Sequence, residues 1–329
     1  MDTYLSDAEL AQATTQLAGI EAMFSQRVVG QEELRRALIA GLLAKGHVLI
    51  ESVPGLAKTT AAQTLAAAVS GTFHRIQCTP DLMPNDIIGT QIYNQATGEM
   101  TTQLGPVHAN IVLLDEINRS SAKTQSAMLE AMQEAQTTIG GVVHPLPKPF
   151  MVMATQNPIE EEGTYVLPEA QMDRFLMKQV ITYPQPREEL EVLERIDDGR
   201  IGADLTGDPI SLADLQELQA MSRRVFIHTT IKTYIVDLIN TTRGAGPNPL
   251  PGFRTHVRVG ASPRGGIALM QVSQALALMA GRNYVIPEDV KAMRHSILRH
   301  RLIRTYDAVA DDVNVDGLVD AVFNAVPVP

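Results

Sequence analysis

Three short aliphatic runs recur in the first half of the chain, and helical patterns alternate with them. The runs are His47–Glu51, Ile111–Leu114 and Phe150–Ala154, and the first leads through a Gly/Pro turn into a helix expected over Thr60–Ser70. A continuous aliphatic run of this length is typical of a strand buried on both faces. Strands that alternate with helices predict a parallel sheet in a three-layer α/β domain.

The second half has helical patterns. Ser211 and Asp214 form a capping-box pattern ahead of an apolar-periodic stretch. Pro287 and the acidic residues after it have the composition of a helix's first turn, and the apolar spacing from Val290 to Ile297 continues that helix. This part of the chain is therefore expected to be helical.

The boundary between the two parts is predicted at a pair of prolines. Pro184 and Pro186 favour extended backbone directly before the helical pattern Glu188–Arg195. We therefore expect one domain over residues 1–186 and a smaller one over residues 187–329.

Composition and charge narrow the classes of protein that fit. Hydrophobic residues make up 45% of the chain, so a sizeable core can be buried. The net charge of −10 disfavours binding to a phosphate backbone, so no nucleic-acid partner is expected. A single cysteine, Cys78, excludes an internal disulfide and a cysteine-rich zinc site. The longest apolar run, Ala37–Ala44, is too short to span a membrane, and the acidic start has no signal-peptide character, so a soluble cytoplasmic protein is expected.

The segment 47–60 consists of a strand, a tight turn, Lys-Thr and a helix. Backbone N–H groups in such a turn and at a helix start converge on an anion. Lys58 is then expected to reach the β- and γ-phosphates of a nucleotide, and the Thr59 hydroxyl to bind Mg²⁺. Ser52 and Ala57 stand where the pattern G-x-x-x-x-G-K-[ST] has glycines. The alternative is an ordinary strand–turn–helix with a surface lysine.

An acidic pair ends the second aliphatic run. Asp115 and Glu116 would lie at the ligand-binding edge of a parallel sheet. Asp115 could hold Mg²⁺ through water, and Glu116 could orient and polarise an attacking water. A strand that ends in two solvated acids is the alternative for this run alone. The two motifs in this order together predict a Mg-nucleotide site.

The chain resembles the MoxR family of AAA+ ATPases, in the helix-2 insert clade, over nearly its whole length. The segments that carry the resemblance, besides the phosphate loop, are Val28–Gln31, Asp115–Glu134, Ala154–Pro158, Leu167–Phe175 and Gly260–Arg264. The resemblance implies an α/β fold with a three-layer P-loop AAA+ parallel-sheet domain, followed by a smaller all-α lid domain. Ala57 is normal for the loop of this family, and Ser52 is the departure.

The resemblance also assigns roles to single residues. Asn157 matches the sensor that positions water against the γ-phosphate, and its alternative is an Asn-Pro turn. Arg174 matches the arginine finger inserted into a neighbouring subunit's site, and a local pair with Asp173 or an ordinary helix-end arginine is its alternative. Arg264 matches the lid sensor in the same subunit as the nucleotide, and a helix-start cap is its alternative. The nucleotide-binding set implied in this way is Val29, Gly30, Ser52, Val53, Pro54, Gly55, Leu56, Ala57, Lys58, Thr59, Thr60 and Arg264.

Two segments fit the hairpin insertions of the clade. The segment 91–100 is expected to turn at Thr97-Gly98, and a second hairpin beginning at Thr137 to turn at Gly140-Gly141. Loops of this type can project into the pore of a ring and grip a partner. Ordinary surface hairpins are the alternative.

The function implied by the resemblance is that of an ATP hydrolase that uses ATP and Mg²⁺ to remodel or mature a partner complex, like a chaperone. A homo-oligomeric ring of six subunits is expected, with a client protein complex and a partner that carries a von Willebrand factor A domain. Two alternatives remain: a nucleotide-gated scaffold with little hydrolysis, and a nucleic-acid or chelatase-type motor subunit.

Overall fold

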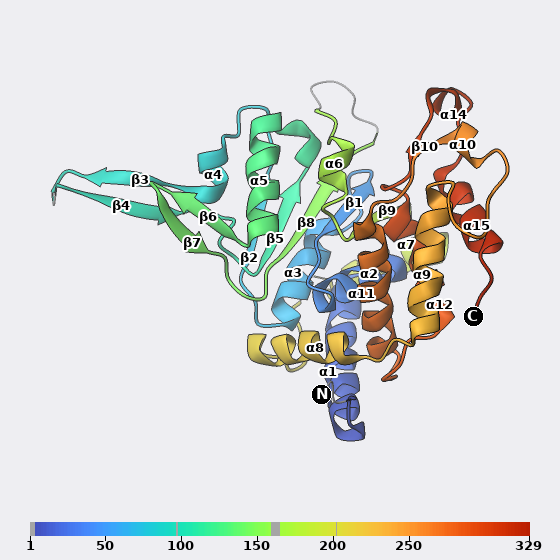
Figure 1. Cartoon of the computed structure of the whole chain (residues 1–329). Helices are drawn as coiled ribbons and strands as arrows, with labels where there is room; N and C mark the ends of the chain where they lie inside the picture. The colour runs from blue at the N-terminus through green and yellow to red at the C-terminus, as the bar shows by residue number, and fades with distance from the viewer. Residues whose placement is uncertain (1–3, 97, 159–164, 202) are drawn as a thin grey trace.

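The computed structural model describes residues 4–96, 98–158, 165–201 and 203–329. Its centre is a parallel five-stranded sheet with the strand order β2-β5-β8-β1-β9 (Figure 1). The strands are β1 (Val48–Ser52), β2 (Phe73–Gln77), β5 (Ile111–Asp115), β8 (Met151–Gln156) and β9 (Met177–Ile181). The predicted parallel sheet is confirmed.

Alternate residues of the central strands enter two different layers, because successive side chains of a strand point to opposite faces. Ile111 and Leu113 pack with the helices α1, α2 and α3, whereas Val112 and Leu114 pack with α4 and α5. The bounds of these helices are α1 (Asp7–Arg27), α2 (Glu32–Leu43), α3 (Lys58–Ala68), α4 (Pro84–Ile88) and α5 (Ala122–Glu134). Helices therefore cover both faces of the sheet, which confirms the three-layer α/β architecture.

The rest of the chain is mainly helical. Its elements, with the short helices η1 and α6 of the first part, are η1 (Ile117–Arg119), α6 (Glu169–Met172), α7 (Pro186–Asp197), α8 (Leu212–Arg224), α9 (Thr229–Thr242), α10 (Phe253–His256), α11 (Pro263–Met279), α12 (Pro287–Ala292), α13 (Arg294–Leu298), α14 (Tyr306–Ala310) and α15 (Val315–Ala325). One short antiparallel ribbon, β10 (Val257–Val259) with β11 (Ile303–Arg304), joins the helices.

Local signals for these helices were partly right. Ser211 accepts a hydrogen bond from the Asp214 amide at 3.1 Å, so the predicted capping box is present. The single helix expected through Val290 and Ile297 is wrong, because Met293 leaves the helical conformation (φ −114°, ψ 22°) and separates α12 from α13.

The lid helices share a core with the sheet domain. α11 packs on α1 and α2 as well as on α8 and α9. The Gln219 side chain of α8 donates a hydrogen bond to the Leu42 carbonyl of α2 at 2.7 Å, in a buried position. The start of the lid is therefore held directly against the helices under the sheet.

Two hairpins lie on one side of the molecule, and β3–β4 reaches furthest out (Figure 1). They are β3 (Gly89–Asn94) with β4 (Glu99–Leu104), and β6 (Gln136–Ile139) with β7 (Val142–Pro145). Gly140 and Gly141 have φ values of 56° and 82°, which glycine adopts without strain, so the predicted turn is confirmed. Thr97 of the other turn lies outside the described residues.

No helix in the described ranges has the length and the apolar character needed to cross a membrane.

Candidate nucleotide site

Ser52 is the last residue of β1 and pairs with Ile181 of β9. It is 2% exposed, and it is not among the residues with positive φ. Positive φ falls instead on Gly55 (84°) and Ala57 (52°) in the loop that follows. A side chain at position 52 therefore costs no backbone strain, and the departure from the glycine pattern is compatible with the loop.

The loop leads into α3 through Ala57, which has left-handed backbone and provides no side-chain cap. The first turn of an α-helix has N–H groups without intrahelical acceptors, here on Lys58, Thr59 and Thr60. These donors and the positive end of the helix dipole favour an anion at this point. The segment 52–60 thus fits the phosphates of a nucleotide.

Lys58 lies in the strand–loop corner. Its Nζ donates to the Ser52 hydroxyl at 2.7 Å and to the Val53 carbonyl at 3.1 Å. Burial lowers the pKa of Lys58, and the negative charges of Asp115 and Glu116 act in the opposite direction. The ammonium group therefore faces both the loop and the acidic pair.

Asp115 ends β5 and is nearly buried. Its Oδ1 accepts a hydrogen bond from the Thr155 hydroxyl at 2.7 Å, and its Oδ2 accepts from Nη2 and Nε of Arg75 at 2.6 and 3.1 Å. No local sequence pattern indicates Arg75 and Thr155, because the pairing of strands distant in sequence brings them to Asp115. They fix the carboxylate at the edge of the sheet.

Glu116 has left-handed backbone (φ 58°), a strained conformation for a residue other than glycine. The backbone amide of Glu116 donates a hydrogen bond to the Thr155 hydroxyl oxygen at 2.8 Å. Its Oε2 accepts from the Gln77 amide group at 2.9 Å and pairs with Nε of Arg119 at 3.2 Å. The Glu116 carboxylate is thus oriented while its side chain stays partly exposed to solvent.

The protein ligands available for a metal are few. Within the described ranges no group of three or more His, Cys, Asp or Glu residues could hold a metal ion by itself. Mg²⁺ commonly binds through one or two carboxylates together with substrate phosphates and water. Asp115 and Thr59 therefore fit a Mg²⁺ ion that arrives with a nucleotide.

A cavity of about 450 Å³ adjoins the phosphate loop. Its lining includes Val29, Gly55 and Thr60 together with Val192 and Ile196 of α7. The mixed apolar wall and the volume suit a nucleoside. The structure thus brings the segment around Val29 to the loop.

Gly30 packs against α7 beside this cavity. It has a φ of 63°, and a Cβ built at this position would lie 2.6 Å from the Glu188 carboxyl carbon. Glycine is therefore required here if Glu188 keeps its place.

Asn157 follows β8 directly and is 7% exposed. Leu114 of β5 is in register with Ala154 of β8, so Asn157 leaves the sheet at the same edge as Asp115. The Asn118 side chain donates to the Asn157 carbonyl at 3.5 Å. Loop, acidic pair and Asn157 thus meet at the carboxyl ends of three neighbouring strands.

Arg174 lies toward the opposite side of the sheet, where the parallel strands begin. Met177 pairs with Val48 at the beginning of β1, and the Leu176 amide donates to the His47 carbonyl at 2.8 Å. A five-residue strand is about 16 Å long, so Arg174 and the phosphate loop are separated by roughly the depth of the sheet. The Arg174 side chain is exposed.

Arg264 follows Ser262 in the first turn of α11, at the cluster around Asp173. Ser262 accepts a hydrogen bond from the Arg264 amide at 3.1 Å and donates to Asp173 Oδ2 at 2.8 Å. Ser262 thus fixes the start of α11 on Asp173.

Asp173 has two side-chain partners in this cluster, Ser262 and the buried Arg301, whose Nε donates at 2.9 Å. Among the described residues no ion pair joins Asp173 to Arg174. The alternative in which Arg174 pairs locally with Asp173 is therefore not observed.

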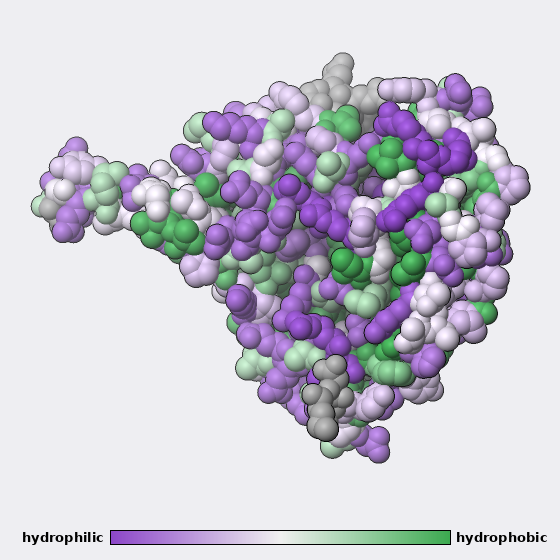
Figure 2. Space-filling model, viewed as in Figure 1, coloured by the Kyte–Doolittle hydropathy of each residue, from purple (hydrophilic) through white to green (hydrophobic). Residues whose placement is uncertain are grey.

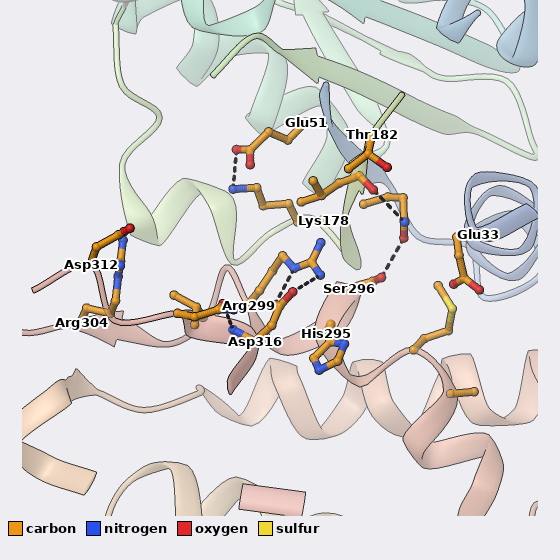
Figure 3. A pocket seen from close by; sticks show the side chains of 16 residues that line it. Glu33, Glu51, Lys178, Thr182, His295, Ser296, Arg299, Arg304, Asp312 and Asp316 are labelled. Atoms are coloured by element: carbon orange, nitrogen blue, oxygen red, sulfur yellow. Dashed lines mark hydrogen bonds and ion pairs between the residues drawn. The ribbon is translucent and has the colours of Figure 1, made fainter. Parts of the chain in front are cut away.

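A larger cavity, of about 800 Å³, lies between β9 and the helices α13 and α15 (Figure 3). It shares no lining residue with the cavity at the phosphate loop. Several of its charged side chains are paired with each other, such as Glu51 with Lys178 at 2.7 Å and Asp316 with Arg299 at 2.8 Å. The smaller cavity, beside the phosphate loop, is therefore the candidate site for a nucleotide.

The fold and the loop define a class, that of P-loop ATPase domains with a helical lid. In agreement, residues 47–177 match the model of the ATPase family associated with various cellular activities, and residues 253–321 match the AAA lid domain.

Several similar proteins have names from one family. The chain is 48% identical to the chaperone MoxR1 of Mycobacterium tuberculosis, over 92% of this chain and 79% of the relative. It is 29% identical to the protein MoxR of Methylorubrum extorquens over 98% of both chains. The crystal structure of a proposed ATPase from Cytophaga hutchinsonii superposes with a TM-score of 0.90 at 40% identity, over 97% of each chain. The chain belongs to the MoxR family of AAA+ ATPases.

Proposed function

We propose that this protein hydrolyses ATP with Mg²⁺ at sites shared between the subunits of a ring. The observation that carries the proposal is the distribution of the site residues. The phosphate loop, Asp115 and Glu116 lie at the carboxyl ends of the strands, whereas Arg174 lies toward their amino ends. One chain therefore offers two half-sites that face different neighbours.

The first half-site binds the nucleotide and activates water. The amides of the loop and of the first turn of α3 would bind the phosphates together with Lys58. Thr59 and Asp115 would hold Mg²⁺, which offsets the negative charge of the phosphate oxygens when bound. Glu116 would accept the proton of the attacking water, and Asn157 would hold that water in place.

The second half-site supplies positive charge. Arg174 is exposed near the Asp173 cluster, and Arg264 follows that cluster in the first turn of α11. We place both guanidinium groups in the site of the adjacent subunit, where they would stabilise charge on the transferred phosphoryl group. For Arg264 this replaces the same-subunit role implied by the resemblance.

The family suggests what work such a ring would perform. The M. tuberculosis relative is named a chaperone. We propose that six subunits form the ring, that it remodels or matures a client complex in the cytoplasm, and that the two hairpins contact the client. A protein with a von Willebrand factor A domain is the partner to test first.

Mixing inactive variants tests the shared site. Lys58→Ala, Glu116→Gln and Arg174→Ala should each abolish steady-state ATP hydrolysis, and wild-type specific activity should rise with protein concentration. Equal amounts of the Glu116→Gln and Arg174→Ala chains should recover about a quarter of wild-type activity, because that share of interfaces is intact. Absence of any recovery in assembled mixtures would refute a shared site.

The same assay distinguishes the two positions proposed for Arg264. If Arg264 acts on the neighbouring subunit, a mixture of Arg264→Ala and Arg174→Ala chains should not recover ATP hydrolysis. Every chain in this mixture lacks one of the two arginines that it must supply to its neighbour. Mixing Arg264→Ala with Glu116→Gln chains should then restore activity. The opposite pattern would return Arg264 to its own subunit.

A nucleotide-gated scaffold is the second candidate, and two contacts favour it. The Ser52 hydroxyl and the Val53 carbonyl hold the Lys58 ammonium, and Arg75 neutralises Asp115. Wild-type protein that binds ATP but turns over no faster than Glu116→Gln would select this candidate.

A further inference from the structure

We propose that the groove between α9 and α11 of one copy receives the α7 helix of the next copy. This inference rests on the proposed ring and names the surfaces that would build it. Its occupant is a second copy of this chain.

The groove is apolar and open to solvent. A cavity of about 330 Å³ lies between α9 and α11, with Ile235, Ile239 and Met270 in its walls. Val236 and Ile267 at its border are 55% and 51% exposed. Figure 2 shows apolar residues gathered on the face over these two helices. Exposed apolar surface of this kind is typical of a contact site.

The surroundings of the groove are basic. A second cavity, of about 730 Å³, shares Lys232 and Met270 with it. The charged residues that line the two cavities are Lys45, Arg223, Arg224, Lys232 and Arg243. No Asp or Glu lines either cavity in the described part of the chain, although the whole chain has a net charge of −10. Glu9 pairs with Arg224. An apolar groove with basic surroundings fits an amphipathic, acidic helix.

The α7 helix has these properties. Leu190, Leu193 and Ile196 recur at a spacing of three residues and are 56%, 64% and 56% exposed, and the helix has no buried residue. Its remaining positions include the acidic residues Glu188, Glu189, Glu191, Glu194 and Asp197. The apolar stripe and the negative charge of α7 complement the groove in both respects.

The two surfaces also adjoin the two half-sites. Leu193 and Ile196 line the cavity beside the phosphate loop. Pro263 and Gly266 line the groove, and Arg264 lies between them in the first turn of α11. Docking of α7 in the groove would therefore bring Arg264 toward the nucleotide cavity of the neighbour. Because the two surfaces differ, the contact is head-to-tail, and repeated rotation can close it into a ring.

Cross-linking of two single-cysteine variants tests the contact directly. Leu190→Cys marks α7 and Val236→Cys marks the groove, while the native Cys78 is 1% exposed and does not compete. A short bis-maleimide should join the two chains when they are mixed with ATP, and should join neither variant to itself. The matched control pairs Leu190→Cys with Val142→Cys, since Val142 is 54% exposed on the β6–β7 hairpin.

Charge reversal gives a second readout. Lys232→Glu should raise the protein concentration needed for half-maximal assembly at least about tenfold, measured by sedimentation, because it places like charges together. Lys148→Glu is the matched control and should assemble as wild type does. Nucleotide binding by Lys232→Glu monomers shows that the variant is folded.

The outcomes separate this contact from the proposed function. If the chains assemble and hydrolyse ATP cooperatively, but no cross-link forms and Lys232→Glu has no effect, the proposed contact is wrong and the ring stands. Self-cross-linking of either variant also overturns the contact. A wild-type chain that stays monomeric with ATP at every concentration overturns the ring and the contact together.

Discussion

Removing the negative charge of Asp173 should destabilise the protein strongly. Arg301 is 5% exposed, and its guanidinium donates to Asp173 Oδ1 at 2.9 Å, to the Phe175 carbonyl at 2.7 Å and to the Leu176 carbonyl at 3.1 Å. Burial lowers the pKa of Arg301 to about 10, yet the group stays charged near neutral pH. Asp173→Asn keeps the size of the side chain and removes the counter-charge.

The expected loss can be bounded from burial. Removing one partner of a buried ion pair costs about 3–5 kcal/mol, since the other charge is left uncompensated. The Asp173 side chain is 20% exposed, so water can partly replace it and the lower end, about 3 kcal/mol, applies. Asp316→Asn is the matched control, because Asp316 pairs with Arg299 at 37% exposure, and about 1 kcal/mol or less is expected there.

Urea unfolding of the full chain, followed by circular dichroism near neutral pH, measures both losses. The Asp173→Asn midpoint should fall well below that of Asp316→Asn, with a similar slope for the two variants. Equal midpoints would show that the Arg301 charge needs no partner, and the reasoning on the buried cluster would be refuted.

Three smaller changes test single features. The Val152 amide donates to Nδ1 of His47 at 3.0 Å, and burial lowers the pKa of His47 from 6.5 to about 4. As the pH drops from about 6.5 to about 4, the unfolded chain binds a proton at His47 before the folded chain does, so the free energy of unfolding should fall by up to about 3 kcal/mol. In urea titrations at several pH values, His47→Gln should flatten this dependence of the unfolding free energy on pH. An unchanged pH dependence would contradict the role given to His47. Ser52→Gly removes the hydroxyl that holds Lys58 at 2.7 Å, so ATP affinity in calorimetry should rise about three- to tenfold, whereas weaker binding would contradict this. Ala57→Gly relieves a left-handed alanine, so thermal unfolding should show a gain of roughly 0.5–1 kcal/mol, and a lower Tm would argue against strain in the loop.

Residues close together in sequence were the most predictable part of the site. The aliphatic run before Asp115 predicts a buried strand that ends in acids, and β5 ends at Asp115. The phosphate loop and the hairpin turn at Gly140-Gly141 follow from local patterns in the same way. Such patterns depend on neighbours within a few residues, so the sequence contains them in full.

Contacts between distant segments were not predictable from these patterns. Arg75 and Thr155 reach Asp115 across neighbouring strands, and nothing in their own surroundings indicates that role. The start of the lid helix α11 is held by Ser262 on Asp173, 89 residues away in sequence, and no local pattern indicates that contact.

The sequence by itself determined the class of fold, the chemistry of the phosphate loop and the identity of the acidic pair, because strand burial, turn residues and helix starts are local properties. The tertiary structure decided which side chains surround Asp115 and Glu116, and on which side of the sheet Arg174 lies. It also decided that the backbone at Ser52 does not need glycine. Those features depend on strand order and on the packing of the lid, which join segments 40 residues apart, such as Asp115 and Thr155, and 128 residues apart, such as Asp173 and Arg301. Packing over such separations is set by the whole core, and no single stretch of the chain specifies it.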